Sequence, residues 1–291
     1  MNFALSPRIR ATGAPPIPAV RGWAARYQGA AGPLLDLTQA VPGYPPHPEL
    51  LARLASAAGD RVAASYGALA GEAALREALA SDMSRAYAAP IGVEDVAITA
   101  GGNLAFTLAM MTLAGGGETV LLPAPWYFNH RMTLDALGIT CRALPCLPED
   151  GFLPDPDRAA GMMEGVRAIV LVSPNNPTGA AYPPDLIARF AKLCHDRGAW
   201  LVLDETYRDF IPEAAGAPHG LFAEARWRDH VVHLYSFSKA YCVPGHRIGA
   251  IAAGAAFLDE LAKAIDTVQI CAPRAPQIAL AAPFLVLLVA L

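Results

Sequence analysis

Two serines, a lysine and an arginine lie close together in this chain, at Ser236, Ser238, Lys239 and Arg247. A lysine amine can bond covalently to an aldehyde, and a guanidinium beside hydroxyl groups can bind a phosphate. The stretch follows the apolar run Val231–Tyr235, which predicts a buried strand, and ligand sites of open α/β sheets lie at strand ends. Taken alone, such a stretch is more often a solvated turn. With support from elsewhere, it predicts a site for one ligand that carries an aldehyde and a phosphate.

An amide, a carboxylate and a phenol supply that support at two further strand ends. Asn176 follows the apolar run 168–172, and Asp204 ends the run 201–204, with Tyr207 three residues later. Each residue alone has an ordinary explanation, as a turn residue, a helix cap or a core phenol. In this order, the three segments resemble those of the class I/II aminotransferases. These are fold-type I enzymes that use pyridoxal 5′-phosphate (PLP).

The resemblance runs over residues 37–277 and implies a role for each catalytic candidate. Lys239 is expected to form the Schiff base with PLP and then to move a proton at the substrate Cα. Asp204 is expected to pair with the ring nitrogen, so that the ring can accept electrons. Asn176 and Tyr207 are expected at the phenolic oxygen of the ring. The resemblance thus implies a transamination between an amino acid and a 2-oxo acid.

The phosphate of PLP needs fixed positive charge and backbone donors. Gly101 and Gly102 follow the short strand 96–99 and open the apolar helix 104–113, so backbone N–H groups would face an anion there. A pair of glycines before a helix is by itself weak evidence. The resemblance assigns the phosphate to Gly102, Asn103, Ser236, Ser238 and Arg247.

Four further residues match family positions around the cofactor and substrate. Trp126, in a proline-flanked loop, is expected to stack on the ring face. Tyr66 matches a tyrosine that reaches the phosphate of the neighbouring subunit, which implies a homodimer. Gly43 and Tyr44, together with Asn176, match the substrate side, although the Pro/Gly-rich segment around Gly43 also fits a simple linker.

Strand and helix patterns alternate along the chain. Near-continuous apolar strands separated by helices predict a mostly parallel sheet that is covered on both faces. The resemblance identifies it as the three-layer α/β large domain of fold-type I PLP-transferases. The expected strands cover residues 96–99, 119–122, 166–172, 200–204, 231–235 and 248–252, and the expected helices cover 48–58, 71–87, 104–113, 131–137, 184–197 and 255–266.

Three segments are expected from this resemblance. Residues 1–47 would form an N-terminal arm with part of the small domain, and residues 48–277 the PLP-binding large domain. Residues 278–291 are an uncharged apolar tail in place of the start of the C-terminal small domain. This tail is shorter than the roughly 20 residues that span a bilayer. Because the family's carboxylate-binding arginine would follow, we interpret the chain as truncated and expect it to have little activity.

Composition narrows the function classes. With 54% apolar and 16% charged residues, the 291-residue chain is globular. Its net charge of −4 gives no support for binding nucleic acid or a membrane surface. Five cysteines without a Cys-x-x-Cys pair suit a reducing compartment. The first residues lack the pattern of a signal peptide. We therefore expect a cytoplasmic protein, with no metal site.

Two alternatives to transamination remain open. The same lysine and aspartate would serve another PLP reaction, such as that of a C–S lyase or a decarboxylase. The chain could also bind PLP with little turnover, as a truncated enzyme or as a ligand-sensing domain. No helix-turn-helix precedes the domain, which counts against a DNA-binding regulator. The sequence does not select the amino acid or the 2-oxo acid.

Overall fold

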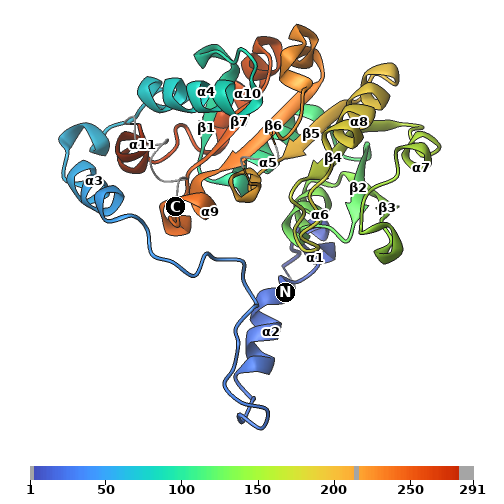
Figure 1. Ribbon diagram of the computed structural model, residues 1–291, viewed down its shortest axis with the longest axis horizontal. Coiled ribbons are helices and arrows are strands. Elements are labelled where there is room, and N and C mark those ends of the chain that lie inside the picture. The colour runs from blue at the N-terminus through green and yellow to red at the C-terminus, as the bar shows by residue number, and fades with distance from the viewer. Residues whose placement is uncertain (1–2, 213–215, 282–291) are drawn as a thin grey trace.

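The computed structural model describes residues 3–212 and 216–281, which form one seven-stranded sheet in the order β1-β7-β6-β5-β4-β2-β3 (Figure 1). Strand β7 runs antiparallel to both of its neighbours, and the remaining pairs are parallel. The mostly parallel α/β sheet is thus confirmed. The strands are β1 Val96–Thr99, β2 Thr119–Ala124, β3 Thr140–Pro145, β4 Val166–Val172, β5 Trp200–Asp204, β6 Val231–Ser236 and β7 Gly249–Ala252.

Helices cover both faces of the sheet, because successive side chains of the buried strands point in opposite directions. Leu171 and Leu203 belong to one apolar core, with α3, α4, α8 and α11, whereas Val170 and Val202 belong to the other, with α5, α6 and α10. The predicted three layers are confirmed. The helices are α1 Pro7–Ala11, α2 Pro16–Ala24, α3 Pro48–Ala58, α4 Ala73–Tyr87, α5 Gly102–Leu113, α6 Phe128–Leu137, α7 Pro156–Ala160, α8 Pro184–Asp196, α9 Phe237–Ala240, α10 Ala255–Val268 and α11 Arg274–Leu280.

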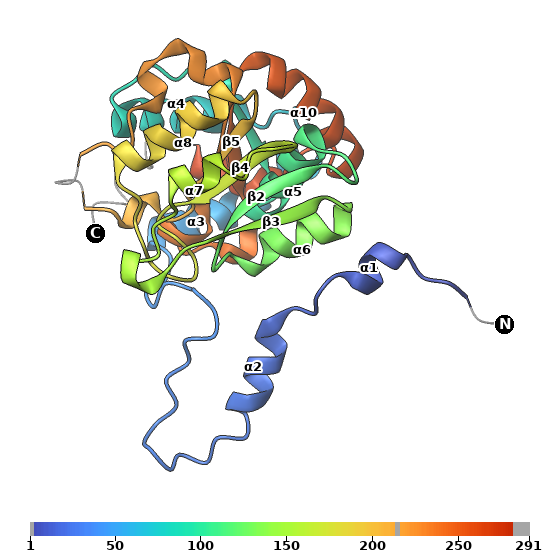
Figure 2. The same cartoon turned by 90° about the vertical axis from the view of Figure 1, so that its right-hand side faces the viewer.

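Strand β3 and the first two helices were not expected from the sequence. Strand β3 is an edge strand, and only Leu144 in it is fully buried, so it lacks the apolar run that marks the central strands. Helices α1 and α2 lie outside the three layers (Figure 2). The side chain of Arg8, on α1, donates to the carbonyl of Leu137 at the end of α6, at 3.2 Å.

The segments at the two ends are only partly described. Residues 3–47 carry α1 and α2, where we expected an arm. Of the expected apolar tail, Ile278 to Leu280 continue helix α11, and residues 282–291 lie outside the described residues. In the described part of the chain, no helix combines the length and the apolar character needed to cross a membrane.

The register of the central strands brings three chain segments to one edge of the sheet. Val172 at the end of β4 pairs with Asp204 at the end of β5, and Asp204 pairs with Leu234 of β6. Strand β6 continues to Ser236, where the short helix α9 begins. Because these strands are parallel, the residues that follow them meet at their carboxyl ends, where open α/β sheets bind ligands.

Candidate functional site

A cavity of about 700 Å³ lies at this edge of the sheet. It is lined by residues from the ends of β4, β5 and β6, from the start of α5, and from α2 and the segment after it. Most of the predicted site residues meet in it. Those that line the cavity are Gly102, Asn103, Asn176, Asp204, Tyr207, Ser236, Ser238, Lys239 and Arg247.

Lys239 is carried by α9, whose first turn is held by the Ser236 hydroxyl. That oxygen accepts a hydrogen bond from the backbone N–H of Ser238 at 3.3 Å. The Lys239 amine donates to the carbonyl of Ala40 and lies 5.9 Å from the centre of the Tyr207 ring. Burial, and secondly the charge of Arg247, lower the pKa of Lys239. A larger fraction of this amine is therefore neutral, as a nucleophile or a base requires.

Asp204 is buried and held by two donors. His130 Nε2 lies 3.1 Å from Asp204 Oδ2, and the backbone N–H of Thr206 donates to Oδ1 at 3.0 Å. Burial alone would raise the pKa of Asp204, but His130 and Thr206 outweigh burial and hold it below the ordinary value. The cavity therefore contains an ionised carboxylate whose position is fixed.

A phenol and an amide lie beside this carboxylate. The amide of Asn176 donates to the Tyr207 hydroxyl at 3.5 Å. Burial, followed by Tyr127 and Asp204, raises the pKa of Tyr207 to about 12. The Tyr207 phenol is therefore neutral near pH 7 and can donate a hydrogen bond to a ligand oxygen.

The start of α5 forms a cradle that suits an anion. Gly101 has φ 91° and ψ 164°, a conformation that only glycine adopts readily, and a Cβ there would collide with the guanidinium of Arg247. A Cβ on Gly249 would lie 2.6 Å from the carbonyl carbon of Gly101. The backbone thus approaches Arg247 closely. Gly102 and Asn103 line the cavity and begin helix α5, whose first N–H groups have no partner within the helix and can bind an anion.

Trp126 does not line the cavity. Its ring packs against the core formed by α5, α6 and α10, and the guanidinium carbon of Arg131 lies 5.6 Å from its centre. The next residue, Tyr127, lines the cavity instead, and its hydroxyl donates to Asn103 Oδ1 at 3.2 Å. The sequence does not indicate which of the two adjacent aromatic residues faces the ligand, because both precede helix α6 in the same loop.

Tyr66, Gly43 and Tyr44 also lie outside the cavity lining. Tyr66 is 79% exposed, and Tyr44 is 54% exposed. The segment Leu37–Ala40 lines the cavity in place of Gly43. The family resemblance placed the segment that begins at Leu37 on the substrate side, although through Gly43 and Tyr44 and not through Leu37–Ala40. It gave no part to helix α2, which carries no catalytic residue type in a strand-end position.

His130 and Thr206 are the polar contacts of Asp204 that sequence reasoning missed. His130 is buried against the Phe106 ring, with ring centres 3.8 Å apart. A histidine two residues into helix α6 carries no sequence signal for a carboxylate partner on β5.

The comparisons with known proteins agree with this geometry. The family model described as aminotransferase class I and II matches residues 33–283. The aromatic aminotransferase ISS1 of Arabidopsis thaliana is 31% identical over 245 residues, which cover 82% of this chain and 60% of that protein. The valine–pyruvate aminotransferase of Mycobacterium tuberculosis is 32% identical over 278 residues, which cover 94% of this chain and 70% of that protein.

Solved structures give the same result. The Thermus thermophilus aspartate aminotransferase with maleate superposes with a TM-score of 0.88 at 26% identity, covering 99% of this chain and 75% of that one. An aminotransferase from Mycobacterium tuberculosis gives 0.85 at 27% identity, with coverages of 96% and 71%. The chain thus spans 60% to 70% of the length of the two curated relatives. The match of the family model over most of the chain shows that this protein belongs to the class I and II aminotransferase family.

Proposed function

We propose that this protein transfers an amino group between an amino acid and a 2-oxo acid, with PLP as the cofactor that its family uses. The observation that carries the proposal is that Lys239, Asp204 and Arg247 line one cavity. An amine, a carboxylate and a guanidinium are the groups that an aldehyde, a pyridine nitrogen and a phosphate require. The names of the relatives differ in the amino acid, so we propose no narrower substrate class.

The polar groups that line the cavity suit the functional groups of PLP. When bound, PLP supplies an aldehyde that reacts with amines and a ring that withdraws electrons from the substrate Cα. The cradle of Gly102, Asn103 and Arg247, with the hydroxyls of Ser236 and Ser238, would hold the phosphate. Because Gly101 leaves no room for a side chain beside Arg247, the backbone can approach that anion closely.

Lys239 is the residue to which we assign both the covalent link and proton transfer. Its lowered pKa favours the neutral amine, which would bond to the PLP aldehyde and would accept a proton from the substrate Cα when it is not bonded to the cofactor. The contact with the carbonyl of Ala40 orients the side chain within the cavity. Because the amine is held in the cavity beside the bound substrate, proton removal takes place within one complex and needs no encounter with a separate base.

The ring would be oriented from several sides. We assign Asp204 to the pyridine nitrogen, where an ionised carboxylate keeps a proton on that nitrogen. The neutral phenol of Tyr207 and the amide of Asn176 suit the phenolic oxygen. We assign the ring face to Tyr127 instead of Trp126, because Tyr127 lines the cavity.

We further propose a homodimer, in which Tyr66 reaches the phosphate site of a second copy. The exposed ring of Tyr66 and the exposed apolar side chains of Val62 and Leu69 support this assignment. Arg274 fixes the segment, since its Nη1 donates to the carbonyls of Val62 at 2.6 Å and of Tyr66 at 3.3 Å. Sedimentation should give a dimer, and Tyr66→Phe should weaken PLP binding. A monomer with unchanged PLP affinity would exclude the shared site.

We place PLP binding in residues 48–277 and the protein in the cytoplasm. All five cysteines are free, which suits a reducing compartment. We propose residues 1–47 as an arm that completes the cavity, because residues of α2 and Leu37–Ala40 line it.

Product analysis tests the proposed reaction. The protein with PLP is mixed with an amino acid and a 2-oxo acid, and mass spectrometry follows the new amino acid and 2-oxo acid formed in equal amounts. Release of ammonia or carbon dioxide without amino transfer would favour elimination or decarboxylation on the same fold. The Lys239→Ala variant is the control, and it should form neither product.

A further inference from the structure

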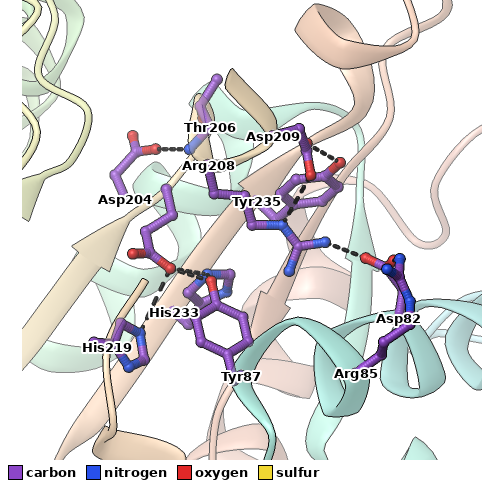
Figure 3. Close-up of polar contacts among 11 residues, drawn as sticks. Asp82, Arg85, Tyr87, Asp204, Thr206, Arg208, Asp209, His219, His233 and Tyr235 are labelled. Carbon is purple, nitrogen blue, oxygen red and sulfur yellow. Dashed lines mark hydrogen bonds and ion pairs between the residues drawn. The ribbon is translucent and has the colours of Figure 1, made fainter. Parts of the chain in front are cut away.

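A buried polar network lies behind the cavity wall that carries Asp204. Glu205 follows Asp204 directly, is 1% exposed and does not line the cavity. The side chains of these two adjacent carboxylates therefore point to opposite sides of the chain. Figure 3 shows the groups around it, which come from helix α4, strand β6 and the segment before Phe222. Nothing in the proposed reaction uses these groups.

Three groups converge on one oxygen of Glu205. The Tyr87 hydroxyl donates to Oε2, His233 Nε2 lies 3.0 Å from it, and His219 Nε2 lies 3.5 Å from it. Each partner is at most 2% exposed. Burial would raise the pKa of Glu205, but His219 and His233 hold it well below its ordinary value. The group is therefore a buried anion, with hydrogen bonds from Tyr87 and His233 and a longer contact to His219, so its partners come from three separate parts of the chain.

Arg208 supplies the second half of the network, three residues further on. Its side chain pairs with Asp82 of α4 and lies 3.3 Å from Asp209, and its guanidinium carbon lies 4.3 Å from the centre of the Tyr235 ring. The hydroxyl of Tyr235 donates to Asp209 at 2.7 Å. Arg208 is 4% exposed, so these contacts are made without competition from water.

The chain between these anchors is the one that lines the cavity. Asp204, Thr206 and Tyr207 face the cavity, whereas Glu205 and Arg208 are buried behind it. The backbone N–H of Arg208 donates to the carbonyl of Glu205 at 3.0 Å, which closes the turn. A shift of this turn would separate buried charges from their partners, and leaving a buried charge without its partner is strongly destabilising.

We propose that Glu205 is a positioning residue, whose buried carboxylate, held by Tyr87 and His233, fixes the turn 204–207 so that Asp204 and Tyr207 face the cofactor. The inference rests on the proposed function, since the cavity it serves is the proposed PLP cavity. Glu205 touches neither cofactor nor substrate, because it lies behind the cavity wall.

The test compares two matched changes of a buried carboxylate to an amide. Glu205→Gln keeps the size of the side chain and removes the anion. Asp95→Asn does the same at a residue that is 2% exposed and paired with Arg228 at 2.6 Å, away from the turn. A general loss of stability would affect both variants, whereas a positioning effect appears in Glu205→Gln alone.

Two measurements are made on each variant. Hydrogen exchange of the peptide 203–210 is followed without PLP, and the affinity and circular dichroism of PLP bound to the protein are measured by titration. We expect Glu205→Gln to speed exchange of this peptide and to weaken PLP binding by about tenfold or more, as loss of a charged hydrogen-bonding group would. It should also change the dichroism of the bound PLP. In Asp95→Asn the exchange of the peptide, the PLP affinity and the dichroism should all equal those of the wild type.

Unchanged exchange with unchanged PLP affinity in Glu205→Gln would overturn the proposal. If Glu205→Gln does not fold, Tyr87→Phe takes its place, because this variant keeps the charge of Glu205 and removes one of its hydrogen-bond donors. Unchanged exchange with unchanged PLP affinity in Tyr87→Phe would then overturn the proposal. A wild-type protein that fails to bind PLP would overturn the proposed function instead. The exchange comparison, made without cofactor, would still decide whether Glu205 holds the turn.

Discussion

Asp204 and Arg247 place opposite charges at separate places in one cavity, and we assign them to opposite ends of PLP. The carboxylate is ionised because His130 and Thr206 hold its pKa low, and the guanidinium lies against the glycines that begin α5. The carboxylate of Asp204 would affect how strongly the ring withdraws electrons, whereas the guanidinium of Arg247 would affect the affinity for the phosphate. Substitutions at the two residues should therefore have different kinetic consequences.

We expect Asp204→Asn to lower kcat by roughly a hundredfold or more with a small effect on PLP affinity, because it removes charge and keeps shape. Arg247→Ala should chiefly weaken PLP binding, because it removes the charged contact to the phosphate. PLP titration and steady-state kinetics of each purified variant measure the two effects. Equal and modest effects from both changes would show that neither residue contacts the cofactor.

At the scale of the element, the start of α5 depends on one backbone conformation. Gly101 combines φ 91° with a site where Arg247 fills the space of a Cβ. Gly117 has a similar φ of 93°, and nothing lies within 4 Å of its Cβ position. Alanine substitutions at Gly101 and Gly117 can therefore be compared. Both would strain the backbone, but only the substitution at Gly101 would disturb the phosphate site.

Both Gly101→Ala and Gly117→Ala should lose stability, by about 1–3 kcal/mol from backbone strain. Only Gly101→Ala should also weaken PLP binding, since its methyl group would displace Arg247. Thermal unfolding and PLP titration of the two variants give the comparison. Equal PLP affinity in both would mean that the turn before α5 does not hold the phosphate.

The central elements could be predicted because their signals are local. Strands β4, β5 and β6 are apolar runs followed by the residues that line the cavity, so the sequence located Asn176, Asp204 and Lys239 at one edge. Which of two adjacent aromatic residues faces the cavity depends on the path of a loop, so no local pattern distinguishes Tyr127, which lines it, from Trp126. The partner of Asp204 on α6 depends on packing between layers, which no local pattern reveals.

At the scale of the whole molecule, buried titratable groups tie the layers together. Helix α4 contributes Tyr87 and strand β6 contributes His233 to the same carboxylate, Glu205, and Arg208 and His219 also face this cluster. A network buried in this way links the stability of the fold to pH.

The free energy of unfolding should fall as the pH drops below about 6.5, and again below about 4.5. Burial lowers the pKa of His233 from its ordinary value of 6.5, so the unfolded chain takes up that proton first. The pKa of Glu205 lies below its ordinary value of 4.5 despite burial, and the same sign applies there. Denaturant midpoints from pH 8 to about pH 3 measure the dependence.

Two histidine variants serve as the comparison for this pH dependence. His233→Asn should flatten the upper step, whereas His195→Asn should leave it, because the side chain of His195 is 51% exposed and lies outside the cluster. Midpoints that stay constant between pH 8 and pH 5 in the wild type would contradict the account of His233.

The central claim, that Lys239 holds the cofactor, can be tested by chemical labelling. The chain has three lysines, Lys192, Lys239 and Lys263, and only Lys239 lines the cavity. The protein is mixed with PLP, reduced with borohydride and digested, and the modified peptide is identified by mass spectrometry. We predict a stoichiometric pyridoxyl group on Lys239, with loss of the label in Lys239→Ala. A label on Lys192 or Lys263, or on none of the three, would contradict the account.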